Sequence, residues 1–598
     1  MRKMRIVHYI SLLMLFCCTA AEAQVWLDPT VTEKGKDLPR TPLISYASRD
    51  EALQGRFERA KSLQPLPSGE EWQVTEDNLT RTYSTTFTMP FVWIDREVFL
   101  HIESAGASYS FEINGTEAGY SQDGHTASEF DITQFVKEDL NTLAVTVHKD
   151  QAAAAIENNI QQSLPLTAYI VSQPRVRVRD IIVETQADHG NGLFAAGVVL
   201  KSHLLNPKSY RVYYELIAPS GDIVSYGHRD LTLDMRREDT VRFLANIPNV
   251  LAWSHKAPYL YTLMIKTQYE GRFGEYIAVP VGFRSLEVND GVLSVNAQPV
   301  ELHATDFAAD GDVSSTADRL QAIKDQGFNT IRVTGAPQPD MFYELCDRLG
   351  LYVVDQAAIN TGKQSDSRRR GGNPSNDPKW ADAYVSRAVG MYHASKLHPS
   401  TVAFTLATDA SNGYCLYESY LALKRIEHVR PILYASAAEE WNTDTLTMNP
   451  SPAAGTDSPQ VSIARTDDGK FIIRNADPLA PVEVAAVYTV RAGRSKVAEG
   501  EKPFIIPAGA SAELTVPLES VKAGKSYTIE LRLEKCEPTY VYTHHVADRG
   551  PQPKQTKAGK IITSVREFFR SKPKPETPLR TTIAEETFTG QKPQGTNR

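Results

Sequence analysis

Short stretches in which apolar and polar residues alternate dominate the chain between residues 80 and 285. Turn signals such as Asn114-Gly115 separate the stretches, so each one predicts a short strand of an antiparallel sheet. The first four predicted strands cover residues 82–87, 98–102, 109–113 and 142–147. About seven more follow with the spacing of an immunoglobulin-like sandwich. We therefore expect a jelly-roll domain over residues 24–174 and an immunoglobulin-like β-sandwich over 175–285.

The pattern changes near residue 295, where helical periods begin to alternate with buried strand patterns. Residues 320–326 and 341–348 carry apolar side chains at helical spacing, and residues 329–333 and 351–354 are typical of buried strands. This succession predicts βαβ units and a parallel sheet. Six candidate strands lie around residues 300–305, 329–334, 351–355, 401–406, 431–435 and 445–448.

Six strands are too few for an eight-stranded barrel, so we expect a truncated TIM-type barrel domain over residues 286–455. Its first and last strands would expose unpaired backbone groups unless another part of the chain covers them. The next sandwich is one candidate for this cover, and a short helix near the end of the chain is another.

Alternation returns after residue 460 and predicts a second β-sandwich over residues 456–545. Residues 546–598 are rich in Pro, Lys and Thr and are expected to be a mostly disordered tail. Five apolar residues of this tail fall on one helical face: Ile561, Ile562, Val565, Phe568 and Phe569. This short amphipathic helix could dock on the barrel, bind a protein partner or contact a membrane surface; a solvated tail is the fourth possibility.

The first 23 residues have the features of a signal peptide. A basic start at Met1–Arg5 precedes a short apolar run over 10–16 and an Ala-x-Ala site at 21–23. The apolar run is too short to span a bilayer, and we expect no transmembrane segment elsewhere. The pattern therefore predicts an exported protein, periplasmic or extracellular.

Composition excludes some functions. A net charge of −8 without a basic stripe gives no reason to expect nucleic acid as a partner. Cys346, Cys415 and Cys536 are scattered and form neither a disulfide framework nor a metal motif. We expect these cysteines to be buried as small apolar residues, and we expect no cofactor.

Local motifs along the chain resemble those of the β-galactosidases of glycoside hydrolase family 2. They are Gly119–Asp123 with Ser128–Asp131, Trp253-Ser254, Pro258–Tyr261, Val281–Arg284, Leu345–Asp355 and His398-Pro-Ser400. The resemblance implies a sugar-binding-like jelly roll, a sandwich, a catalytic barrel and a further sandwich, and a β-linked glycan as ligand. Retaining glycosidases of this kind need two carboxyl groups about 5–5.5 Å apart, an acid/base and a nucleophile.

The resemblance places the acid/base position at Asp409, where the family has Glu after Asn. Asp is one methylene shorter, and a carboxyl set back by about 1.5 Å can lose on the order of a hundredfold in rate. An Asp at a strand end also commonly caps a turn. The family's nucleophile strand has no counterpart, because only about ten residues separate Thr445–Pro450 from the next sandwich. Glu439 and Glu440 are the nearby candidates to replace the nucleophile, although two acidic residues in such a loop are more often simply exposed to solvent.

Other positions implied by the resemblance have changed as well. Two family metal ligands, Glu and His, are replaced by Asn360 and Gly362, so we expect no metal site. The family's substrate-contacting Asp segment corresponds to residues 157–162. Asn114 and Arg332 persist, and the resemblance implies substrate binding for both. A hairpin turn for Asn114 and a buried ion pair for Arg332 are the alternatives.

Two functions of different class follow. The favoured one is a catalytically impaired or inactive family relative that binds carbohydrate or assembles with partner proteins. The alternative is an active exo-β-glycosidase that hydrolyses terminal β-galactosides with Asp409 as its acid/base.

Overall fold

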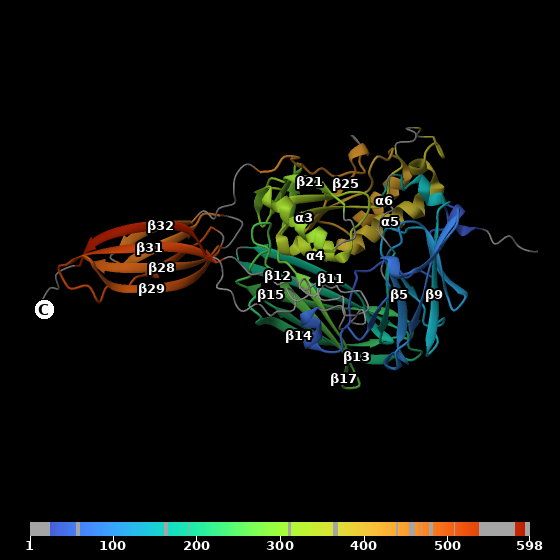
Figure 1. Cartoon of the computed structure of the whole chain (residues 1–598), viewed down its shortest axis with the longest axis horizontal. Helices are drawn as coiled ribbons and strands as arrows, with labels where there is room; N and C mark the ends of the chain where they lie inside the picture. Colours follow the sequence, from blue (N-terminus) through green and yellow to red (C-terminus); the bar gives the residue numbers. More distant parts are fainter. Residues whose placement is uncertain are drawn as a thin grey trace, which may run out of the picture.

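The computed structural model describes most of the chain. The described ranges are 24–55, 60–67, 69–158, 160, 166–188, 190–308, 313–362, 367, 369–437, 440–453, 461–467, 469–477, 482–507, 509–536 and 580–592. Three domains pack together, and a C-terminal sandwich stands to one side (Figure 1). The predicted signal peptide and the predicted helix around Ile561–Phe569 lie outside the described residues. Among the described residues, no helix is long and apolar enough to cross a membrane.

The N-terminal domain has the two packed sheets of a jelly roll, in agreement with the sequence. One sheet has the order β1-β7-β6-β9-β4-β3, with bounds Glu33–Lys34, Thr116–Ser121, Tyr109–Ile113, Leu140–His148, Thr80–Thr88 and Gln73–Glu76. The other is β2-β10-β5-β8, with bounds Leu63–Pro65, Thr167–Gln173, Glu97–Ser104 and Ser128–Asp131. Apolar side chains such as Phe111, Phe130 and Ile170 form the core between them.

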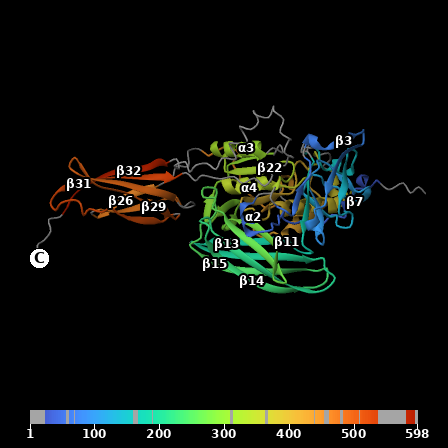
Figure 2. The ribbon, with the colours of Figure 1, turned by 60° about the horizontal axis from the view of Figure 1, so that its bottom comes forward.

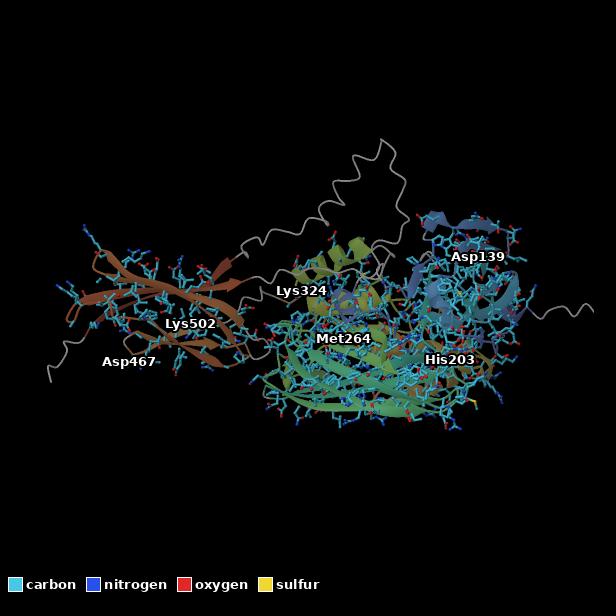
Figure 3. The ribbon with its side chains drawn as sticks, turned by 90° about the horizontal axis from the view of Figure 1, so that it is seen from below. Asp139, His203, Met264, Lys324, Asp467 and Lys502 are labelled. Atoms are coloured by element: carbon cyan, nitrogen blue, oxygen red, sulfur yellow. The ribbon has the colours of Figure 1, made fainter. Side chains whose placement is uncertain are left out.

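The second domain is the predicted immunoglobulin-like sandwich. A three-stranded sheet contains β11 (Val176–Asp188), β12 (Asn191–Ser202) and β15 (Glu238–Pro248). The four-stranded sheet has the order β14-β13-β16-β17, over Ile223–Leu233, Lys208–Ile217, Tyr261–Tyr269 and Arg272–Val281. Side chains along β12 are alternately buried and less buried, as a strand with one core face requires. Met264 of β16, labelled in Figure 3, belongs to the same buried apolar cluster as Phe99 and Tyr169 of the jelly roll, so the two domains share part of a core.

The barrel domain contains a five-stranded parallel sheet in sequential order (Figure 1). Its strands are β21 (Ala304–Phe307), β22 (Thr330–Val333), β23 (Tyr352–Gln356), β24 (Thr401–Thr405) and β25 (Ile432–Leu433). The helices are α3 (Val313–Asp325), α4 (Asp340–Leu349), α5 (Ala381–Ser395) and α6 (Tyr414–Lys424). A small antiparallel sheet of β18 (Leu286–Asn289), β19 (Val292–Val295) and β20 (Gln298–Val300) precedes them. Figure 2 shows the jelly roll and the immunoglobulin-like sheets on two sides of this domain.

The predicted sixth strand at 445–448 is wrong, because this segment forms no strand in the structure. Instead, the segment 443–449 connects the two edges of the sheet. Beside β25, the amide of Asp444 donates to the Ile432 carbonyl at 2.8 Å. Beside β21, the Asn449 amide donates to Leu302 at 2.7 Å, and Ala304 donates to the Asn449 carbonyl at 2.8 Å. Among the described residues, this segment therefore provides the cover that the exposed strand edges need.

The C-terminal sandwich is larger than the sequence predicted. Its sheets are β26-β27-β30 (Val461–Asp467, Lys470–Asn475, Ser511–Thr515) and β29-β28-β31-β32 (Ser495–Ile506, Val482–Ala492, Ser526–Cys536, Arg580–Gln591). The prediction of a mostly disordered tail from 546 is wrong for residues 580–591, which pair with β31. Phe588 of β32 packs against Phe471, with ring centroids 4.8 Å apart. Asp467 and Lys502 mark this separate sandwich in Figure 3.

Candidate functional site

Asp409 lies just beyond the carboxyl end of β24. Thr408 forms an isolated parallel bridge with Asn360, and the chain then turns at Asp409, whose φ is 41°. The Asp409 side chain is exposed, and its backbone carbonyl accepts a 3.4 Å hydrogen bond from the Thr361 hydroxyl. A left-handed backbone is uncommon for a residue other than glycine, although Asp tolerates it better than most. Such conformations concentrate at functional sites, so the geometry keeps Asp409 as a candidate.

Arg332 and Asp306 form an ion pair at the same end of the sheet. The two residues are register partners on β22 and β21, and Arg332 Nη2 lies 2.7 Å from Asp306 Oδ1. Ile331 and Val333, the neighbours of Arg332, are buried against α4, so alternation turns Arg332 toward the opposite, interior face. The side chains of Arg332 and Asp306 are 45% and 57% exposed. The predicted ion pair is present, but the expectation that it is buried is wrong.

Glu157, at the family's substrate-contacting segment, is held inside the protein. Its carboxylate forms an ion pair with Arg387 of α5, and both side chains are 1% exposed. Arg387 Nη1 also donates to Gln122 Oε1 of the jelly roll at 3.2 Å. The Glu157 carboxylate lies 3.7 Å from His125 Nε2. Burial alone would lower the pKa of His125, but the nearby carboxylates of Glu157 and Asp123 outweigh it and raise that pKa. The charge of Glu157 is therefore committed to the domain interface.

The same jelly-roll loop contacts the two positions, 360 and 362, to which the resemblance assigns metal ligands. Asn158 donates its backbone amide to the Asn360 carbonyl at 2.8 Å, and the Asn360 side-chain oxygen accepts from the Gly362 amide at 2.8 Å. Gly362 has a φ of +64°, and a Cβ added there would lie 2.1 Å from Asn158 Nδ2. A histidine at 362 would therefore collide with Asn158. A neutral amide and a glycine offer no anionic oxygens, so the residues present do not fit magnesium.

Asn114 is engaged within the jelly roll. Asn114 and Gly115 have φ values of 53° and 75°, which suit a type I′ hairpin between β6 and β7. The side-chain Nδ2 donates to the Phe135 carbonyl at 3.0 Å and to Asn141 Oδ1 at 2.9 Å, and Oδ1 accepts from the Thr142 amide at 3.1 Å. Both hydrogens of the amide nitrogen are thus used, which favours the turn over a contact with substrate.

The two substitute nucleophile candidates give no further support to catalysis. Glu439 lies outside the described residues. Glu440 follows the short helix η8 (Ala435–Ala437), and its backbone amide donates to the Ala437 carbonyl at 3.1 Å. This places Glu440 in a loop that ends a helical turn.

Three sequence profiles match consecutive parts of the chain. The sugar binding domain of glycosyl hydrolases family 2 matches residues 64–171, a second family 2 domain matches residues 176–284, and the TIM barrel domain matches residues 287–466. The chain belongs to glycosyl hydrolases family 2.

The relatives of this family 2 protein include β-galactosidases. The enzyme of Psychromonas ingrahamii is 28% identical over 393 residues, which are 62% of this chain and 37% of that protein. The enzyme of Vibrio cholerae is 25% identical over 480 residues, covering 69% and 46% of the two chains. The chain thus spans less than half the length of these relatives.

Solved β-glucuronidase structures have a similar fold. Bacteroides uniformis β-glucuronidase aligns with a TM-score of 0.54 and 14% identity, over 76% of this chain and 72% of that one. For the B. uniformis β-glucuronidase 2 the TM-score is 0.55 and the identity 13%, over 83% and 78%. At these identities the likeness shows the fold alone.

Two of the family 2 motifs meet beneath the site. His398 Nδ1 lies 2.7 Å from Asp347 Oδ2, and Nε2 lies 3.2 Å from Asp340 Oδ1. Asp347 Oδ1 also accepts from the Ser400 amide at 2.9 Å, just before β24 begins. Burial lowers the pKa of His398, but the two carboxylates outweigh it and raise the pKa to about 10. The two motifs therefore form a buried ionic support for β24.

Proposed function

We propose that this family 2 protein, exported to the periplasm or beyond, binds a β-linked glycan and has lost or nearly lost hydrolysis. The observation that supports the proposal is that residues 157 and 158, in the segment to which the resemblance assigns substrate contact, are engaged within the protein. Glu157 is neutralised by Arg387, and Asn158 takes the space of a metal ligand. A sugar would find neither the substrate carboxylate nor the cation at these positions.

The chemistry of retaining hydrolysis supports the same proposal. Two carboxyl groups about 5–5.5 Å apart have to flank the glycosidic bond. Asp409 is one candidate, and Asp306, the other exposed carboxylate described above, is already paired with Arg332. Because Asp306 is committed to this pair, we expect no covalent glycosyl intermediate to form on it.

A second candidate function is an exo-β-glycosidase of the β-galactosidase type. Asp409 favours it, since this exposed carboxyl follows a buried barrel strand in a left-handed conformation. Release of the aglycone from an aryl β-galactoside by the chain 24–598 tests the two functions. The proposal expects no release above that of the Asp409→Ala variant, and release that this substitution abolishes would establish the second function.

A further inference from the structure

Trp441 is an exposed tryptophan on the loop that follows β25. Its side chain is 55% exposed, while Trp72, Trp93, Trp253 and Trp380 are buried, and Trp26 is half-buried. A ring of this size costs free energy when water covers it. Its position on the barrel loops therefore calls for an explanation.

Two tyrosines of α6 pack against the exposed ring. Tyr417 of α6 stacks on Trp441, with ring centroids 5.2 Å apart and an interplanar angle of 20°, and Tyr420 meets it edge-on at 5.8 Å. The Tyr420 hydroxyl donates to Asp444 Oδ1 at 2.8 Å, and Lys424 donates to Asp444 Oδ2 at 2.6 Å. Tyr417 covers one face of the indole, which leaves the opposite face as the one that a ligand could stack on.

This aromatic surface lies beside the Asp409 loop. The side-chain amides of Asn412 and Asn442 exchange two hydrogen bonds, of 3.1 and 2.9 Å, and so join the loop after β24 to the loop after β25. The Tyr434 hydroxyl also donates to the Ala410 carbonyl at 2.5 Å. Both loops extend from the carboxyl ends of parallel strands, the end at which barrel proteins bind ligands.

We propose that the open face of Trp441, backed by Tyr417, binds a pyranose ring of a β-galactoside oligosaccharide. The electron-rich face of an indole attracts the partly positive C–H groups on one side of such a ring. A preformed aromatic surface also loses little conformational freedom on binding. Two exposed residues on the adjoining elements carry polar groups that could bond the sugar hydroxyls: Asp409 on the joined loop, and Tyr414, 41% exposed and one helical turn before Tyr417. The choice of a β-galactoside as the ligand rests on the proposed function, whereas the existence of the aromatic surface does not depend on it.

Isothermal titration with β-1,4-linked galactotetraose tests the inference on the chain 24–598. We expect the Trp441→Ala variant to bind about tenfold more weakly than the parent, in line with the loss of one aromatic stacking contact. The Trp441→Phe variant should retain part of the affinity. Phe91→Ala serves as the matched control, because Phe91 is 85% exposed on the jelly roll, and this variant should bind like the parent.

The outcomes separate the surface from the proposed function. If the parent and Trp441→Ala bind galactotetraose equally well, the assignment of the ligand to the Trp441 surface is wrong, while the proposal of glycan binding stands. Absence of binding by the parent overturns both. Sedimentation reports a further outcome. If the parent is a dimer, Trp441→Ala is a monomer and the glycan affinity is unchanged, the ring belongs to a contact between copies of the chain instead.

Discussion

Glu157 and Arg387 show how a residue in a segment to which the resemblance assigns substrate contact can serve the structure instead. Their side chains are almost fully buried and come from positions far apart in the sequence, the jelly roll and α5. A buried pair of this kind contributes little net stability, but the loss of one partner leaves an unpaired charge in the interior. Loss of one partner from the exposed pair of Arg332 and Asp306 costs little, because water solvates the charge that remains.

Arg387→Met should therefore destabilise the protein far more than Arg332→Met. We expect the first change to lower the free energy of unfolding by about 3–5 kcal/mol and the second by less than about 1 kcal/mol. Urea unfolding followed by circular dichroism measures both variants. Equal losses would mean that Glu157 is not an interior charge that needs Arg387.

His398 gives the stability of the barrel a defined dependence on pH. Its folded pKa of about 10 lies above the ordinary value of 6.5 for an unfolded chain. The imidazolium therefore stabilises the fold fully below about pH 6.5, and this contribution is lost as the pH rises toward 10. The difference in unfolding free energy between the parent and His398→Gln should shrink over this range. A difference that grows from pH 6 to pH 10 would contradict the ion pairs with Asp347 and Asp340.

At the scale of elements, two segments with weak apolar patterns complete the fold. Residues 443–449 cover both edges of the five-stranded sheet through a few backbone hydrogen bonds, with Leu446 and Met448 packed against its interior. The strand β32 completes the C-terminal sandwich across a long interval of sequence. Alternation predicted a sixth strand for the first segment and nothing for the second, because backbone pairing partners are not visible in a local pattern.

Removal of β32 tests its role directly. A chain that ends at residue 579 would leave the β31 edge unpaired and expose Phe471 to water, so we expect the C-terminal sandwich to melt at lower temperature. Calorimetry and limited proteolysis measure the effect, with a chain that ends at residue 592 as control. An unchanged melting profile would show that β32 is dispensable.

At the scale of the whole molecule, α5 ties the three packed domains together. Arg387 reaches the jelly roll, and Lys396, just beyond α5, pairs with Asp180 of the immunoglobulin-like domain. The sequence predicted the domain order, because strand periods and motifs are local. It could not predict that Arg387 neutralises Glu157, since 230 positions separate them. The exposed Trp441 could have been noticed only as an aromatic residue in a polar loop.

The loss of hydrolysis is the central claim, and one measurement tests it most directly. The chain 24–598 is incubated with an aryl β-galactoside beside its Asp409→Ala variant, at equal concentration and with matched circular dichroism spectra. The account predicts no release of the aglycone above the variant, because Asp306 is paired with Arg332 and the residues at 360 and 362 do not fit a cation. Steady turnover by the parent that Asp409→Ala abolishes would contradict the account and identify Asp409 as a working acid/base.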